Sequence, residues 1–272
     1  MRKALTFGMA FTCAVYAQSV FQPNQPPRFR PDALSTVWPY TTYTAAHLAD
    51  GQGWTSDIIL MSLGSTPQCF SVQIYGNTGA PLAVPLVSYG TQSSVRICLQ
   101  PLGSATLKST GASSPLIEGW VLLGCDPMLS FCFGGPGAPI AGSIVFRRST
   151  PGQPDFEAAV PFDDNSVSHV ALPFDNTNGF LTGLALTNPQ KSQTVVTFVL
   201  HAEDGTQLFV TAFSLGPRQH MSFVLPTTYP QTAGTRGVLE ITSTSGVGVL
   251  GLRFNPTGPF TTLFPVTNGL WQ

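Results

Sequence analysis

Two acidic residues at alternate positions form the pair whose spacing could support catalysis. Asp155 and Glu157 lie in the segment PDFEAAVP, and on a β-strand their side chains would point to one face, roughly 7 Å apart. Carboxylates at that range can hydrolyse glycosidic bonds. Arg147 and Arg148 precede them across a turn rich in Pro, where cross-strand ion pairs form readily. We therefore favour ion pairs, and keep a glycosidase-like secreted hydrolase that uses Asp155 and Glu157 as the alternative.

Other catalytic and metal-binding patterns are missing from the sequence. It contains neither the Gly-x-Ser-x-Gly pattern of serine hydrolases nor the His-Glu-x-x-His pattern of zinc hydrolases. The histidines, at positions 47, 169, 201 and 220, are scattered, and His47 and His169 each stand at the head of a similar segment. Equivalent positions in a repeat usually serve the fold. We therefore predict a protein that is not an enzyme, with no catalytic residue, metal site or cofactor.

Two loops rich in oxygen atoms resemble calcium-binding loops without matching their pattern. Asp50 opens the loop DGQG and Asp175 opens DNTNG, but neither loop has acidic residues at alternate positions followed by a distal Glu. Asx turns explain both aspartates. Asp163, Asp164 and Asn165 lie where the two similar segments meet, and they are candidate interdomain residues that could add ligands for calcium.

The cysteines predict disulfide bonds in the first part of the chain. Cys13 falls in the predicted leader, which leaves Cys69, Cys98, Cys125 and Cys132. An even number of cysteines in an oxidising compartment suggests two disulfides, and four cysteines allow three pairings. We favour Cys69 with Cys98 and Cys125 with Cys132. Because Cys125 and Cys132 are too far apart in sequence for the usual zinc spacing, a metal site is the less favoured alternative.

Tryptophans are the candidate ligand-binding residues. Trp38, Trp54 and Trp120 lie in or before the first of the two similar segments, and a row of exposed aromatic rings could stack on the sugar rings of a polysaccharide. Trp54 and Trp120 stand beside apolar strand residues. A place in the core is therefore the interpretation that we favour for these two residues.

Composition and charge narrow the class of partner. Charged residues make up 9% of the chain, against roughly 25% in an average soluble domain. Twelve basic residues nearly balance thirteen acidic ones, which gives a net charge of −1. No large basic surface can be built from that balance, so we predict no nucleic-acid partner. Hydroxyl and amide groups keep such a chain soluble, and the partner that we expect is a polysaccharide or a surface protein.

The N-terminal residues predict export. Residues 1–17 have a basic start, a short apolar core and the small-residue ending Val15-Tyr16-Ala17, as in a signal peptide. No later run of about 20 apolar residues follows, so we predict no membrane span. We expect a secreted protein, located outside the cell, in a periplasm or on the cell surface. Residues 18–43 are rich in proline, which predicts a linker or an N-terminal arm.

An internal repeat predicts the domain organisation. The segment HLADGQGWTSDIILMSL, from His47 to Leu63, returns as LPFDNTNGFLTGLALTN, from Leu172 to Asn188, about 125 residues later. Each copy places a Gly/Asn turn before a run of alternating apolar residues, which is typical of a turn that leads into a strand. We therefore predict two tandem β-sandwich domains, the disulfide-bearing 44–164 and the cysteine-free 165–272.

Period-two alternation and turn residues place the strands. We predict strands in the first domain at 54–63, 69–75, 82–87, 95–99, 104–108, 117–123, 140–148 and 156–160. In the second domain we predict strands at 181–187, 194–201, 207–214, 220–224, 236–243, 247–254 and 261–266. Equivalent hairpin turns are expected at Asn77-Thr78-Gly79 and Glu203-Asp204-Gly205. This number of short strands is typical of an immunoglobulin-like sandwich, so the predicted fold class is all-β.

One stretch resembles a known group of proteins. The string Ala49-Asp50-Gly51-Gln52-Gly53-Trp54-Thr55, an Ile/Leu-rich strand after it, and the later PDFEAAVP segment resemble secreted bacterial proteins with uncharacterised tandem immunoglobulin-like repeats. The resemblance implies a fold and a location, and it implies no functional residue. We expect a non-catalytic binding or structural protein that contacts polysaccharide or protein at a cell surface or matrix. A spacer or assembly module of a larger surface structure is a further alternative, and the sequence leaves the oligomeric state open.

Overall fold

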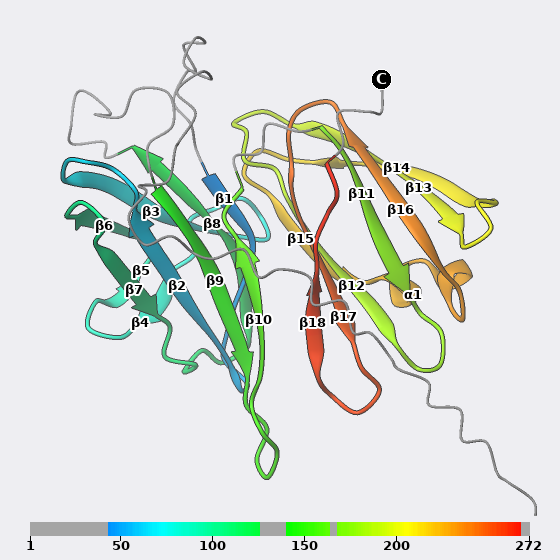
Figure 1. The fold of residues 1–272 in the computed structure, drawn as a ribbon, viewed down its shortest axis with the longest axis horizontal. Coiled ribbons are helices and arrows are strands. Elements are labelled where there is room, and N and C mark those ends of the chain that lie inside the picture. The colour runs from blue at the N-terminus through cyan, green and yellow to red at the C-terminus, as the bar shows by residue number, and fades with distance from the viewer. Residues whose placement is uncertain (1–42, 126–139, 164–167, 268–272) are drawn as a thin grey trace, which may run out of the picture. The chain divides into compact units, whose positions relative to one another are not determined.

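Nearly all of the regular secondary structure in the described residues is antiparallel β-sheet, which confirms the predicted all-β fold class (Figure 1). The structure, a computed structural model, describes residues 43–125, 140–163 and 168–267. The predicted signal peptide, nearly all of the proline-rich linker, and four candidate site residues lie outside this part of the chain: Trp38, Cys132, Asp164 and Asn165. Within the described part, no helix is long and apolar enough to cross a membrane.

The first half of the described chain, residues 43–163, forms two four-stranded sheets with the orders β1-β8-β3-β6 and β10-β9-β2-β7. A two-stranded hairpin of β4 and β5 accompanies them. The strands are β1 (Tyr43–Asp50), β2 (Trp54–Ser62), β3 (Gln68–Gly76), β4 (Val84–Leu86), β5 (Gly90–Gln92), β6 (Ser94–Leu99), β7 (Ser104–Lys108), β8 (Ile117–Cys125), β9 (Ile140–Arg148) and β10 (Phe156–Pro161).

The second half, residues 168–267, also forms two four-stranded sheets, with the orders β11-β16-β13-β14 and β15-β12-β17-β18. Its strands are β11 (His169–Asp175), β12 (Leu181–Thr187), β13 (Thr194–Ala202), β14 (Gln207–Leu215), β15 (His220–Val224), β16 (Arg236–Ser243), β17 (Gly248–Phe254) and β18 (Phe260–Leu263). A short helix α1 (Leu225–Thr228) and a 3₁₀ turn (Pro230–Thr232) connect β15 to β16.

The two halves share one topology. When the β4–β5 hairpin is set aside, the eight strands of each half follow the same chain order and occupy the same places in the two sheets. The predicted hairpin turns are confirmed as equivalents: Gly79 N donates to Gly76 O, and Gly205 N donates to Ala202 O. Both glycines have positive φ angles, +84° and +83°, which favour glycine. The internal repeat is therefore a repeat of topology as well as of sequence.

A buried hydroxyl group fixes the repeated turn in both halves. Ser56 Oγ accepts from Ala49 N at 3.1 Å and donates to Ala49 O at 2.8 Å. Thr182 Oγ1 accepts from Asp175 N at 2.9 Å and donates to Asp175 O at 3.2 Å. In each half a hydroxyl from the strand after the turn therefore satisfies the backbone N–H and C=O of a residue near the end of the strand before it.

The two aspartates of these turns have different roles. Asp175 Oδ1 accepts from the backbone and hydroxyl of Thr177 at 3.1 and 2.7 Å, which confirms the predicted Asx turn. The prediction was wrong for Asp50. Its carboxylate accepts from Gly111 N at 2.6 Å and Ser113 N at 3.1 Å, so it ties the turn to a distant loop. A sequence pattern cannot show a partner that only the fold brings near.

The hydrophobic core of the first half extends into the second half. Its cluster of buried residues includes Ala185, Leu250, Leu252 and Phe260, from β12, β17 and β18. A second cluster fills the space between the two sheets of the second half. The side chains of β1 and β12 are buried on both faces for nearly their whole length. The two halves therefore belong to one compact unit, and their separation into independent domains stays a prediction.

Three strands were not predicted, β1, β5 and β11. A strand that is buried on both faces shows no alternation of apolar and polar residues, which explains why β1 was assigned in part to the linker. Pro173 interrupts β11, and Pro argues against a strand unless the strand lies at a sheet edge. β11 is such an edge strand.

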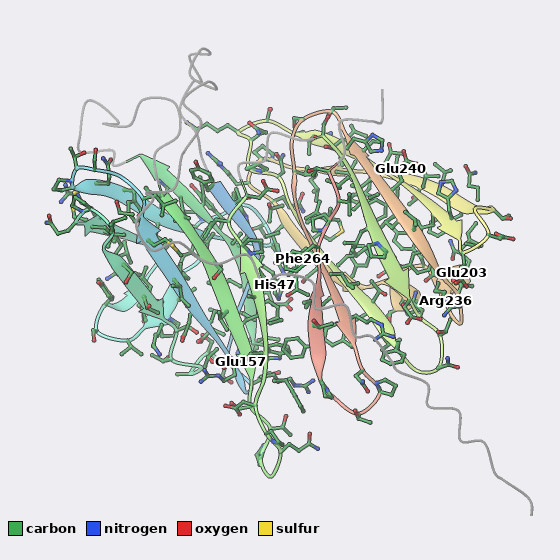
Figure 2. The ribbon with its side chains drawn as sticks, viewed as in Figure 1. His47, Glu157, Glu203, Arg236, Glu240 and Phe264 are labelled. Atoms are coloured by element: carbon green, nitrogen blue, oxygen red, sulfur yellow. A yellow bond between two sulfur atoms is a disulfide. The ribbon has the colours of Figure 1, made fainter. Side chains whose placement is uncertain are left out.

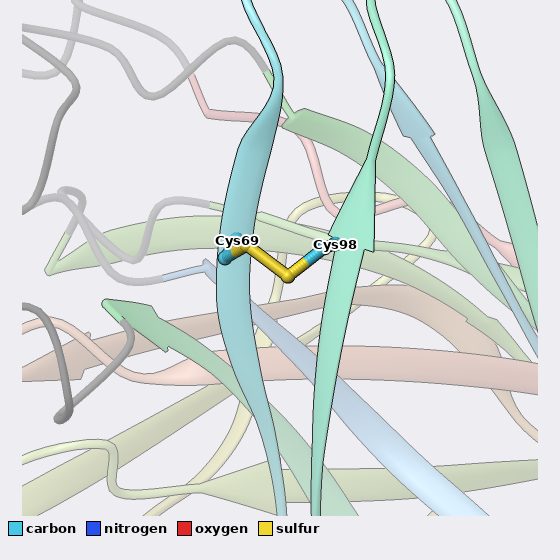
Figure 3. Close-up of a disulfide and its surroundings, with 2 residues drawn as sticks. All are labelled: Cys69 and Cys98. Carbon is cyan, nitrogen blue, oxygen red and sulfur yellow. A yellow bond between two sulfur atoms is a disulfide. The ribbon is translucent and has the colours of Figure 1, made fainter.

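One disulfide bond joins neighbouring strands (Figure 3). Cys69 on β3 and Cys98 on β6 are directly opposite in the antiparallel register, and their sulfur atoms are bonded, which confirms this predicted pair. Cys125 lies at the end of β8, where its backbone is opposite Phe70 of β3. The predicted bond from Cys125 to Cys132 involves a residue outside the described part of the chain.

We expect the disulfide to contribute to stability. Replacing Cys69 and Cys98 together by Ser should lower the free energy of unfolding by about 3 to 4 kcal/mol, because the bond closes a loop of 29 residues in the unfolded chain. Guanidinium unfolding of the variant and of the parent protein measures the difference. Identical midpoints would show that the bond places no constraint on the unfolded chain.

Removing the buried hydroxyl of the repeated turn should be equally costly in the two halves. We expect Ser56→Ala and Thr182→Val each to lower the free energy of unfolding by about 1 to 3 kcal/mol, because each leaves buried backbone groups without a partner. Chemical denaturation measures both, with the exposed Ser65→Ala as the control that should change little. A loss in only one half would mean that the turn is not equivalent in the two copies.

Candidate functional site

A cleft of about 190 Å³ lies where the two halves meet. Its apolar walls come from the second half and include Leu184, Leu250, Leu252 and Phe254. Its polar groups are His47 and Glu118 from the first half and Ser222 from β15. Trp54 of the first half adds an aromatic ring. An apolar cavity with a few convergent polar groups is the usual form of a ligand site, so this cleft is the candidate functional site.

A carboxylate–hydroxyl pair crosses the cleft. Ser222 Oγ donates to Glu118 Oε2 at 3.1 Å, between residues that are 104 positions apart in the chain. The contact arises because β8 and β15 both face the junction of the two halves. A half-buried carboxylate next to a hydroxyl group can accept or exchange hydrogen bonds with a polar ligand that enters the cleft.

Two buried histidines lie at the junction of the halves, and one of them, His47, lines the cleft. His47 on β1 is 8% exposed and His220 on β15 is 2% exposed. Their rings stack with centroids 5.5 Å apart, and His47 Nδ1 lies 3.4 Å from His220 Nε2. His220 Nδ1 is also 2.6 Å from Asn77 Oδ1. Figure 2 shows His47 at this junction.

Burial keeps both histidines neutral. Removal from water, followed by the nearby His47, lowers the pKa of His220 to about 3. Burial also lowers the pKa of His47, and the negative charge of Glu118 opposes this effect only in part. At pH 7 neither ring therefore carries a charge. Both are contact residues between the halves, as expected for histidines that serve the fold.

The tryptophans have different positions. Trp54 is partly buried beside the cleft, where its ring lies 5.3 Å from that of Phe260 and the guanidinium of Arg148 stands 5.6 Å from its centre. Trp120 is fully buried. Its Nε1 donates to Arg218 O at 2.9 Å, and its ring stacks on Tyr75 at 5.1 Å. Trp120 therefore has the core position that we favoured from the sequence, and Arg218 of the second half caps its indole nitrogen.

The predicted carboxylate pair forms ion pairs on the exposed surface of β9 and β10. Arg147 Nη2 contacts Glu157 Oε1 at 2.6 Å, and Arg147 Nε lies 3.8 Å from Asp155 Oδ2. Arg147 and Glu157 are directly opposite in the register. The hydrogen bond to Glu157 raises the pKa of Arg147. This is the arrangement that we favoured from the sequence, and Figure 2 shows Glu157 on this surface.

The aspartates that we considered as calcium ligands have other interactions in the structure. The carboxylate of Asp175 accepts from Arg253 Nη2 at 2.6 Å. Burial raises the pKa of Asp175, but hydrogen bonds from Thr177 and Arg253 outweigh this effect and lower it. Asp163 pairs through its backbone with Thr44 of β1, while its neighbours Asp164 and Asn165 are not described.

The remaining two histidines gather around one carboxylate. His169 Nε2 lies 2.8 Å from Glu240 Oε1, and His201 Nε2 lies 3.7 Å from Glu240 Oε2. Across the described ranges, no group of three His, Cys, Asp or Glu side chains is arranged to hold a metal ion.

Sequence reasoning missed Glu118 and Ser222. Neither residue belongs to a motif, and they come together only because the two halves pack on each other. The single signal in the sequence is β1, where the segment YTAAHLAD places a histidine among apolar residues. Such a pattern indicates burial without showing what covers the strand.

His220 should link stability to pH. Its pKa of about 3 in the folded protein is lower than the unfolded value of about 6.5, so the unfolded chain binds a proton that the folded chain does not. Stability is therefore complete above pH 6.5 and is lost as the pH falls towards 3. At pH 5 we expect a loss of about 2 kcal/mol from His220, measured by guanidinium unfolding at pH 8 and pH 5.

The variant His220→Gln should reduce this dependence, because glutamine makes hydrogen bonds without titrating. His201→Gln, on the half-exposed surface around Glu240, is the matched control. If His220→Gln and the parent protein lose the same stability between pH 8 and pH 5, the buried histidine pair is not the cause.

Comparisons with known proteins found no protein similar to this chain. No family model matches the chain. Neither a curated protein nor a solved structure shows significant similarity to it. The function must therefore be argued from the geometry of the fold and the cleft.

Proposed function

We propose that the protein is a secreted, non-catalytic binding protein of two tandem immunoglobulin-like sandwiches, and that the cleft between them binds a sugar unit of a surface or matrix polysaccharide. The observation that carries the proposal is the cleft itself, in which an aromatic ring and a hydrogen-bonded carboxylate from one half face apolar walls and a hydroxyl from the other. The shared strand order and the paired four-stranded sheets support the tandem sandwiches.

The chemistry of the cleft matches that of a sugar ring. A pyranose has apolar C–H faces and a rim of hydroxyl groups. Trp54 and Phe254 supply aromatic contact, while Glu118 and Ser222 supply an acceptor and a donor for ligand hydroxyls. The volume of about 190 Å³ is below the roughly 300 Å³ of typical pockets for drug-sized ligands, so a single ring or side chain is the largest group that fits.

Two observations support a role without catalysis. Glycoside hydrolysis usually needs two carboxyl groups on either side of the bond that breaks. Among the described residues that line the cleft, Glu118 is the only carboxylate, and the pair of Asp155 and Glu157 is held by Arg147. Export is supported by the predicted leader and by the bond between Cys69 and Cys98, because disulfides persist in oxidising compartments.

Retention of the purified protein on a panel of insoluble polysaccharides and cell-wall material tests the proposal. We expect retention on one polymer, and binding at least about tenfold weaker for Glu118→Gln, because a hydrogen bond to a charged group is worth about 1.5 to 3 kcal/mol. Glutamine has the same size and can still accept from Ser222, so the fold should be unaffected.

Glu157→Gln is the matched control, because it makes the same chemical change on the exposed ion pair. Binding should be unchanged in this variant. Failure to bind any polymer would reject the carbohydrate proposal. Release of soluble sugar by the parent protein, lost in Glu157→Gln, would instead establish the hydrolase alternative.

A further inference from the structure

The edge strand β14 differs from the other sheet edges of the molecule. An edge strand presents backbone N–H and C=O groups that can pair with another chain, and proteins usually block such edges with charges, prolines or short strands. β14 has nine residues, QLFVTAFSL, with no charged residue and no proline. Among the described elements it packs extensively only against β13. Figure 1 shows β14 at the outer side of its sheet.

The other edges carry at least one of these protections. β6 contains Arg96 and β7 contains Lys108. β10 contains Glu157 and Pro161, and it lies beside β18 of the second half. β11 contains Pro173, while β15 and β18 have only five and four residues. The strands β4 and β5 of the small hairpin have only three residues each, and β1 is buried against β12 and β17 of the second half. Among the edge strands that the structure describes, β14 alone is long, uncharged and free of proline without being covered by the other half.

We infer that β14 pairs with β14 of a second copy of this chain, antiparallel and about a twofold axis, so that two four-stranded sheets join into one. A twofold contact places each residue opposite its symmetry mate. With Thr211 on the axis, Phe209 faces Phe213 of the second copy and Val210 faces Ala212. No like charges meet along the strand, and aromatic and β-branched cross-strand pairs are favourable.

Charges at the two ends of the hairpin support the antiparallel direction. The turn between β13 and β14 carries the exposed acidic residues Glu203 and Asp204, and Glu203 pairs with Arg236 of its own chain at 2.7 Å. Figure 2 shows Glu203 and Arg236 at this end. The opposite end carries the exposed Lys191, in a turn held against the end of β14 by Gln193 Nε2, which donates to Ser214 Oγ at 2.9 Å.

Antiparallel pairing places the acidic end of one copy beside the basic end of the other, twice in each dimer. Asp204 of one chain then approaches Lys191 of the second chain. A parallel arrangement would instead bring like charges together. The occupant of this edge is therefore a second copy, and this inference is independent of the sugar-binding proposal because β14 contributes no residue to the cleft.

Sedimentation equilibrium of the purified protein over a range of concentrations tests the inference. The parent protein should show a concentration-dependent mass up to twice that of one chain. Val210→Lys should be monomeric, because Val210 is 52% exposed on the edge strand and the two lysines would lie near each other across the axis. Val238→Lys is the matched control, on the same face but on the inner strand β16 and 43% exposed, and it should dimerise like the parent.

A charge exchange tests the direction of pairing. Asp204→Lys and Lys191→Asp should each raise the dissociation constant roughly fivefold, the range expected for exposed ion pairs, and the double variant should restore dimerisation. A parent protein that stays monomeric at all concentrations, or a Val210→Lys variant that dimerises normally, overturns the inference. Single charge changes whose effects simply add in the double variant overturn the antiparallel arrangement.

Discussion

The burial of β1 and β12 between the two halves is the constraint on which the rest of the structure depends. Each strand has one face towards its own sandwich and the other towards the neighbouring half, and the first hydrophobic cluster includes four residues of the second half. Burial of this kind removes apolar surface from water at roughly 25 cal/mol per Å². The two halves therefore stabilise each other. They resemble each other only in strand topology and in a weak sequence repeat.

The same packing creates the polar features of the junction. Contact between β1 and β15 puts His47 and His220 where water cannot reach them, and their charged forms become unfavourable. Contact between β8 and β15 joins Glu118 to Ser222 and leaves a cleft beside Trp54. Trp120 is lost as a surface residue because the turn that contains Arg218 covers it. The cleft and the stability of the fold therefore both depend on the packing of the two halves against each other.

The sheet of the second half that contains β14 differs from the sheets at the junction in how its edge is protected. There the exposed edge, β14, is made of apolar, hydroxyl and amide residues without charge, whereas the edges near the junction are covered or charged. A protein with only 9% charged residues has few groups available to protect its edges. The positions of these few charged residues therefore determine which edge strand can pair with another chain.

The sequence by itself determined the elements that local physics specifies. Alternation and turn residues placed β7, β9, β15 and β16 at their observed bounds, because half-buried strands carry a period of two. The repeated turn and the pairing of Cys69 with Cys98 also followed from residue types. Tertiary structure alone decided that β1 is a strand, that Asp50 binds a distant loop, that Trp120 is covered, and that Glu118 meets Ser222. Each of these depends on which surface lies opposite, and residues 61 to 104 positions apart carry no local signal of that partner.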